Sequence, residues 1–90
     1  MTTVSRTVRI SAHNGAHARP VAELARLALT HGTSVVIRTA DGAEADVTSV
    51  LAVMDLALGE GDVVVLEAAD GAATSALLDA MVDVLAPREP

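Results

Sequence analysis

The side chains with which this chain could do chemistry gather near its N-terminus, in residues 14–20 (Asn-Gly-Ala-His-Ala-Arg-Pro). Helices accept proline only in the first turn, so Pro20 predicts a helix start within a residue or two of it. His17 would then lie at the helix N-terminus, where unpaired N–H groups and the helix dipole favour anions and keep the imidazole neutral. Arg19 adds a planar guanidinium suited to phosphoryl oxygens. The segment therefore combines a nucleophile, an anion-binding helix end and a fixed cation.

The composition argues against metal chemistry. The 90 residues predict one domain (1–90), and they include no cysteine, so neither a disulfide nor a thiolate metal site is possible. His13 and His17 are separated by an Asn-Gly pair that breaks any shared helix face, and no third ligand is apparent. We expect no metal and no cofactor.

Charge and hydropathy limit the partners. The net charge is −6 and no residue is aromatic, so phosphate backbones are repelled and bases have no ring to stack on. No apolar run approaches the roughly 20 residues of a membrane span, and residues 1–10 lack the apolar block of a secretory leader. We expect a cytoplasmic monomer that neither binds nucleic acid nor inserts into a membrane.

The N-terminal third predicts a strand followed by a helix. Residues 6–10 alternate between apolar and polar side chains, which is typical of a half-buried strand. The helix after Pro20 carries apolar residues at helical spacing, and Leu29 is assigned to its apolar face. His31 and Gly32 are expected to end it, because glycine accepts the left-handed conformation that follows a last turn.

The remaining residues predict three strands and two helices. Residues 34–39 and about 43–46 form a hairpin across an Asp-Gly turn, and a short helix spans 48–56. The run 62–67 is apolar on both faces and therefore predicts a central strand. The Asp-Gly pair at 70–71 is expected to cap a last helix. The order βαββαβα indicates an α+β fold, a split sheet with helices layered on one face.

The segment around His17 resembles the phosphorylation site of the HPr family, the histidine-containing phosphocarriers of the bacterial phosphotransferase system. The family motif Gly-Leu-His-Ala-Arg-Pro compares with Gly-Ala-His-Ala-Arg-Pro at residues 15–20, so only Ala16 departs from it. Further similarities follow along the chain: the Asp-Gly turn at 41–42, the stretches 48–51 and 53–56, and Gly61 before an apolar strand. The resemblance covers residues from about 4 to 85.

This resemblance implies both a fold and an activity. The implied fold is an open-faced, two-layer sandwich, with an antiparallel sheet ordered 1-4-2-3 and three helices on one face. The implied activity carries a phosphoryl group from phosphoenolpyruvate, through Enzyme I, to Nδ1 of His17 and on to the IIA domains of sugar permeases. Arg19 would stabilise the phosphoryl group, and Ala18 and Pro20 would support the helix start. Such a protein is a carrier and not an enzyme.

The resemblance also implies a regulatory serine and a docking surface. Ser49 matches the serine that an HPr kinase phosphorylates in some bacteria, although a serine at a helix start is equally typical of a cap. Val50 and Leu51 match positions that contact partner proteins, and Arg26 is expected to lie nearby on the same docking surface. For Val50 and Leu51, ordinary core packing is the alternative.

Two other classes of function fit these residues. The phosphohistidine could serve a regulatory branch, in nitrogen-type signalling or a dihydroxyacetone kinase relay, instead of sugar uptake. Alternatively, the chain is a small α/β binding module in which the His-Ala-Arg-Pro run is incidental. Incubation with Enzyme I and phosphoenolpyruvate separates a carrier from a binding module.

Overall fold

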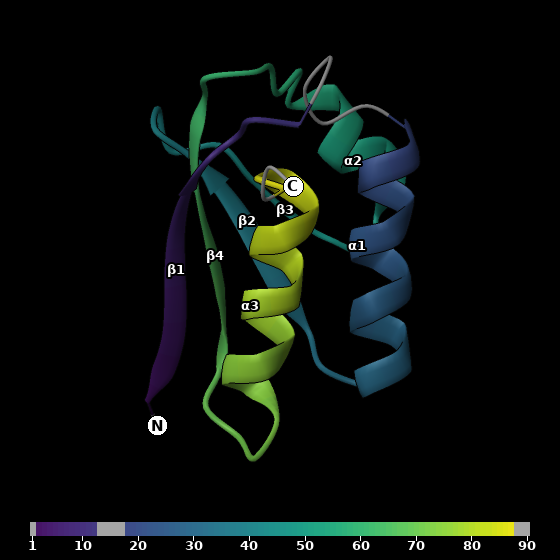
Figure 1. Cartoon of the computed structure of the whole chain (residues 1–90), viewed down its shortest axis with the longest axis vertical. Helices are drawn as coiled ribbons and strands as arrows, with labels where there is room; N and C mark the ends of the chain where they lie inside the picture. Colours follow the sequence, from purple (N-terminus) through teal and green to yellow (C-terminus); the bar gives the residue numbers. More distant parts are fainter. Residues whose placement is uncertain (1, 13–17, 88–90) are drawn as a thin grey trace.

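The computed structural model describes residues 2–12 and 18–87 of the chain. Seven elements follow one another in the predicted order: β1 (Thr3–Arg9), α1 (Ala18–His31), β2 (Val35–Thr39), β3 (Glu44–Asp46), α2 (Val50–Asp55), β4 (Val63–Ala69) and α3 (Thr74–Leu85). Figure 1 shows the helices gathered on one side of the sheet, with α1 and α3 side by side.

The sheet is antiparallel, and its strands lie in the order β1-β4-β2-β3. β4 lies inside the sheet between β1 and β2, as its apolar residues on both faces predicted. Its inward side chains, among them Leu66, are buried, and the outward Val65 is half-buried. This strand order and the helices on one face are the arrangement that the resemblance implied.

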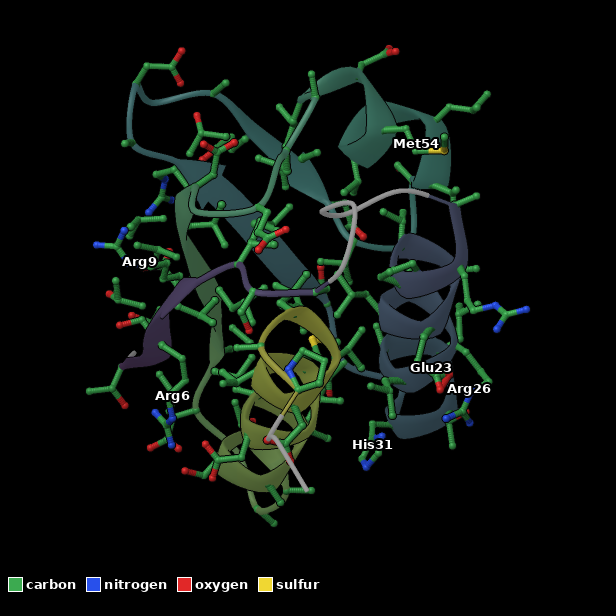
Figure 2. The ribbon with its side chains drawn as sticks, turned by 45° about the horizontal axis from the view of Figure 1, so that its top comes forward. Arg6, Arg9, Glu23, Arg26, His31 and Met54 are labelled. Atoms are coloured by element: carbon green, nitrogen blue, oxygen red, sulfur yellow. The ribbon has the colours of Figure 1, made fainter. Side chains whose placement is uncertain are left out.

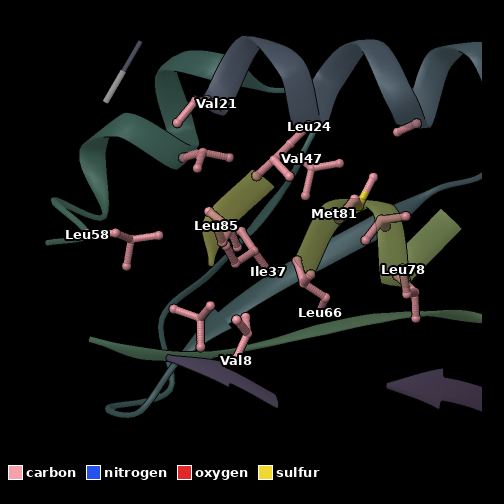
Figure 3. Packing of buried hydrophobic residues seen from close by; sticks show 14 of the residues in the cluster. Val8, Val21, Leu24, Ile37, Val47, Leu58, Leu66, Leu78, Met81 and Leu85 are labelled. Atoms are coloured by element: carbon pink, nitrogen blue, oxygen red, sulfur yellow. The ribbon is translucent and has the colours of Figure 1, made fainter. Parts of the chain in front are cut away.

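The buried side chains form one cluster between the sheet and the helices. Figure 3 shows sheet and helix residues meeting in it: Val8, Ile37, Leu66, Leu24 and Leu85. Because the sequence has no aromatic residue, the cluster consists of aliphatic side chains and the sulfur-containing Met81. Its cohesion comes from many small dispersion contacts, none of which is large alone.

Both ends of α1 have the form that the sequence predicted. Pro20 is the third residue of the helix, in the first turn, where its missing N–H would have had no acceptor within the helix. At the other end, Gly32 takes a left-handed φ of 64°, and His31 Nδ1 lies 2.9 Å from the carbonyl oxygen of Leu27. Glycine thus closes the helix while the imidazole reaches a carbonyl of its last turn.

The prediction that Asp70 and Gly71 cap the last helix is wrong. α3 starts at Thr74, and Ala73 occupies its N-cap position without a side-chain cap from any described residue. The Asp70 N–H donates instead to the carbonyl oxygen of Thr2, at 3.0 Å. The Asp70 carboxylate also accepts from the Thr2 hydroxyl at 3.5 Å, so both its backbone and its side chain tie the end of β4 to the start of β1.

The assignment of Leu29 to the apolar face of α1 is also wrong, because 70% of its surface is exposed. Position 29 lies four residues after the buried Ala25, at the margin of the buried stripe. At such a margin helical spacing alone does not decide whether a side chain faces the core or the solvent. Leu29 is a single exposed leucine, which is common on protein surfaces.

One arginine of β1 lies on the helix side of the sheet. Arg6 Nε donates to Asp79 Oδ1 at 2.9 Å, and its Nη2 donates to Ser75 Oγ at 2.6 Å. Both acceptors belong to α3. Arg6 shares this face of the strand with Val4 and Val8, which pack against or within the core. The guanidinium therefore links the outermost strand to the helix that covers it.

Leu66→Ala is expected to lower the free energy of unfolding by about 2–5 kcal/mol, because it leaves a cavity under the central strand. Leu29→Ala is the matched control, and its effect should stay below about 0.5 kcal/mol because that leucine is exposed. Urea denaturation followed by circular dichroism measures both. Equal losses in the two variants would contradict the placement of β4 at the centre of the core.

Candidate functional site

Three residues on which the sequence analysis depends lie outside the described part of the chain: His13, Ala16 and His17. The role of His17 as phosphoacceptor therefore stays a prediction. The geometry of the candidate site is built from the residues on either side of this segment and from the short helix that packs beside α1.

The backbone is anchored on both sides of residues 13–17. Before them, the N–H groups of Ser11 and Ala12 both donate to the carbonyl oxygen of Leu85, at 2.9 and 3.0 Å, at the end of α3. After them, α1 starts at once with Ala18. The first turn of this 14-residue helix, where unpaired N–H groups favour an anion, therefore begins at the residue that follows position 17 in the sequence.

Arg19 and Arg26 both lie on α1 but differ in their partners. Arg19 is exposed and has no hydrogen bond or ion pair with any residue that the structure describes. Arg26 donates through two nitrogens to the two carboxylate oxygens of Glu23, and Figure 2 shows the two side chains together. The hydrogen bond from Arg26 lowers the pKa of Glu23, and the same contact raises the pKa of Arg26. Within residues 2–12 and 18–87, Arg19 is therefore the guanidinium of α1 that has no side-chain partner.

The exposed surface of α1 is hollowed beside these arginines. The hollow has a volume of about 490 Å³. It is lined by five residues of α1 and one of α3: Arg19, Pro20, Ala22, Glu23, Arg26 and Val84. The structure therefore brings the predicted residues Arg19 and Arg26 to one surface.

α2 supplies the exposed apolar residues near the start of α1. Figure 1 shows this helix beside the N-terminal end of α1, and the two helices are in contact. Leu51 is 78% exposed and Met54 is 40% exposed, whereas Val53 is fully buried. Val50 is half-buried and packs against the core. Of the two apolar residues predicted for docking, Leu51 is exposed and Val50 is half-buried, and Arg26 is exposed on α1.

Ser49 occupies the N-cap position of α2 but does not cap it. Its side chain is exposed and makes no cap hydrogen bond with a described residue, although its carbonyl oxygen accepts from the Val53 N–H at 3.0 Å. The capping alternative for Ser49 is therefore wrong, and its hydroxyl faces solvent.

Asp46 holds the turn before α2, and the sequence analysis did not single it out. Its Oδ1 accepts from the Thr48 hydroxyl at 2.6 Å and from the Thr48 N–H at 2.9 Å. Its Oδ2 accepts from the Ser34 hydroxyl at 3.2 Å. The Thr48 hydroxyl bond, and then the Thr48 N–H bond, lower the pKa of Asp46. The available sequence signal was an aspartate two residues before a threonine, a spacing typical of an Asx turn.

Neither a cluster of metal ligands nor a membrane-spanning helix occurs in the described part of the chain. Residues 2–12 and 18–87 contain no cluster of three or more histidine, cysteine, aspartate or glutamate side chains that could hold a metal ion. Within the same ranges, every helix is too short or too polar to pass through a lipid bilayer.

Comparisons with known proteins agree with this small α+β sandwich. A family model described as the PTS HPr component phosphorylation site matches residues 4–86. The chain therefore belongs to the HPr family, and its family and fold assign it a phosphocarrier role in the phosphotransferase system. No curated protein matches its sequence.

Solved HPr structures have the same fold. The phosphocarrier protein HPr of Bacillus anthracis is 26% identical, with a TM-score of 0.83, over 94% of this chain and 99% of that one. A histidine-containing phosphocarrier protein of Mycoplasma is 23% identical, with a TM-score of 0.76, over 90% of each chain. HPr-C-His of Thermoanaerobacter tengcongensis is 25% identical, with a TM-score of 0.71, over 94% of this chain and 91% of that one.

Proposed function

We propose that this chain accepts a phosphoryl group on Nδ1 of His17 from phosphorylated Enzyme I and passes it to IIA domains of sugar permeases. The observation that carries the proposal is the start of α1 at Ala18, directly after His17, in a chain that the HPr family model matches over residues 4–86. The exposed Arg19, without a partner in the described residues, supports it.

The chemistry needs a site that holds a phosphoryl group and releases it again. In the first transfer, the bond from phosphorus to Enzyme I breaks as the bond to the imidazole nitrogen forms. In the second transfer, the bond from phosphorus to the imidazole nitrogen breaks as the bond to the IIA domain forms. Backbone N–H groups and the dipole at a helix start contribute about 0.3–1 kcal/mol each. Arg19 adds a charge-assisted contact from the solvent side. These contacts stabilise the phosphorylated state without making it too stable to react.

The proposal extends to the setting in which the protein works. We place it in the cytoplasm as a monomer that acts as a substrate of Enzyme I and as a donor to IIA domains, without turnover of its own. The exposed Leu51 and the hollow beside Arg19 and Arg26 offer an apolar and a basic surface for these partners.

Incubation with Enzyme I and radiolabelled phosphoenolpyruvate tests the proposal. The wild-type chain should acquire a label that acid removes and alkali does not, and His17→Ala should acquire none. His31→Ala is the matched control, because His31 lies exposed at the far end of α1 and should leave labelling unchanged. An unlabelled wild-type chain, or a labelled His17→Ala, would refute the proposal. Transfer to different IIA-type acceptors then separates sugar uptake from a regulatory branch.

Arg19→Ala is expected to slow phosphoryl transfer about tenfold or more, since a hydrogen bond to a charged group contributes about 1.5–3 kcal/mol. Its melting temperature should stay unchanged, because Arg19 is exposed and has no partner in the described residues. Arg9→Ala, which removes an exposed arginine of β1, is the control for loss of charge. Unfolding of Arg19→Ala would show a structural role instead, and equal slowing by Arg9→Ala would point to a general charge effect.

We further propose that Ser49 is a target for an HPr kinase, because its hydroxyl is exposed and does not cap α2. Ser49→Asp should raise the KM of Enzyme I for this chain about two- to fivefold, the effect of one added surface charge of about 0.4–1 kcal/mol. Ser75→Asp places the same charge at the start of α3, next to Arg6, and should leave the KM unchanged. Equal KM values for Ser49→Asp and the wild type would remove the regulatory proposal.

A further inference from the structure

Few interactions within α2 itself stabilise this helix. The helix has six residues, which is too short to be stable by itself, and no described side chain caps its start. Val53 is its one fully buried residue, Val50 is half-buried against the core, and Leu51 is 78% exposed. The turn before α2 therefore contributes, together with these packing contacts, to the direction of the helix.

That turn is held by the carboxylate of Asp46, the last residue of β3. One oxygen accepts both the hydroxyl and the N–H of Thr48, at 2.6 and 2.9 Å, and the other accepts the hydroxyl of Ser34, at 3.2 Å. The Asp46 carbonyl accepts the Ser49 N–H at 2.9 Å. The neighbouring Val47 is fully buried, and its N–H donates to the carbonyl oxygen of Val35. Asp46 thus joins the start of β2 to the residues that open α2.

We infer that Asp46 is a positioning residue for partner docking, because it sets the orientation in which α2 presents Leu51. This inference rests on the proposed function, since it takes Enzyme I as the partner. Asp46 belongs to the turn before α2 and not to the histidine segment. Its loss therefore weakens docking and leaves the transfer step unchanged.

A matched control is available in the hairpin between β2 and β3. The Asp41 carboxylate accepts the Thr39 hydroxyl and, at 3.5 Å, the Ala43 N–H. It has the same kind of turn contacts as Asp46, and hydrogen bonds lower the pKa of both groups. Asp41 precedes β3, and in the described structure its side-chain hydrogen bonds stay within the hairpin, with Thr39 and Ala43. Asp41→Ala therefore removes a comparable turn without disturbing the start of that helix.

The experiment measures KM and kcat for phosphorylation of the full chain by Enzyme I. Asp46→Ala should raise KM about two- to tenfold with kcat unchanged, the range expected when one or two hydrogen bonds are lost. Asp46→Asn keeps an acceptor for the Thr48 N–H and should recover part of the loss. Asp41→Ala should leave KM unchanged. Thr48→Val removes the hydroxyl that donates to Asp46 with little change in shape. It replaces Asp46→Ala in this experiment if that variant does not fold.

A double-mutant cycle with Leu51→Ala separates positioning from a general loss of stability. If Asp46 acts through Leu51, Asp46→Ala should change KM less than about twofold in the Leu51→Ala background, because coupled residues are not additive. Amide hydrogen exchange of Thr48 should also become faster in Asp46→Ala, with exchange in α1 unchanged. Additive effects, or equal KM changes for Asp46→Ala and Asp41→Ala, would overturn the inference. If Enzyme I does not phosphorylate the wild-type chain, the proposed function itself is overturned.

Discussion

The pairing of β4 with two strands at once is the interaction on which the rest of the fold depends. All seven of its residues pair with β1 and five of them pair with β2, two strands that come before and after α1 in the chain. At its start, the Ile10 N–H donates to the carbonyl oxygen of Asp62 at 2.8 Å, and the Gly61 N–H donates to that of Ile10 at 2.7 Å. The path of the chain out of β1, toward the histidine segment, is therefore fixed by a strand far away in the sequence.

Sequence patterns predicted the elements better than their tertiary contacts. Pro20 and Gly32 mark the ends of α1 because each acts through its own backbone, and the double apolar face of β4 indicated a central strand. Periodicity left the complete strand order open, and the resemblance to the HPr family supplied it. The errors at Asp70 and Leu29 have another origin. Asp70 contacts Thr2, a residue far away in the sequence, so its own segment does not reveal the contact. Leu29 lies at the margin of the buried stripe of α1, where its exposure depends on how the helix packs.

The candidate site was predictable in its residue types but not in the state of each side chain. Arg19 and Arg26 look alike in the sequence, yet Glu23 engages only Arg26 within the described residues. Arg38 pairs with Glu44 and Glu67 on the open face of the sheet, and the sequence contains no lysine. Of the five arginines within the described residues, three form ion pairs, so few uncompensated cations remain there in a chain with a net charge of −6.

The contacts of Arg6 bear on how this protein stays in solution. Among the described residues β1 pairs only with β4, so its other edge offers backbone groups to any extended chain. An incoming strand would have to pack its side chains around a guanidinium that Asp79 and Ser75 hold in place. An inward-pointing charge on an edge strand discourages such addition. The ion pair between Arg6 and Asp79 therefore also opposes aggregation through the addition of strands to the β1 edge.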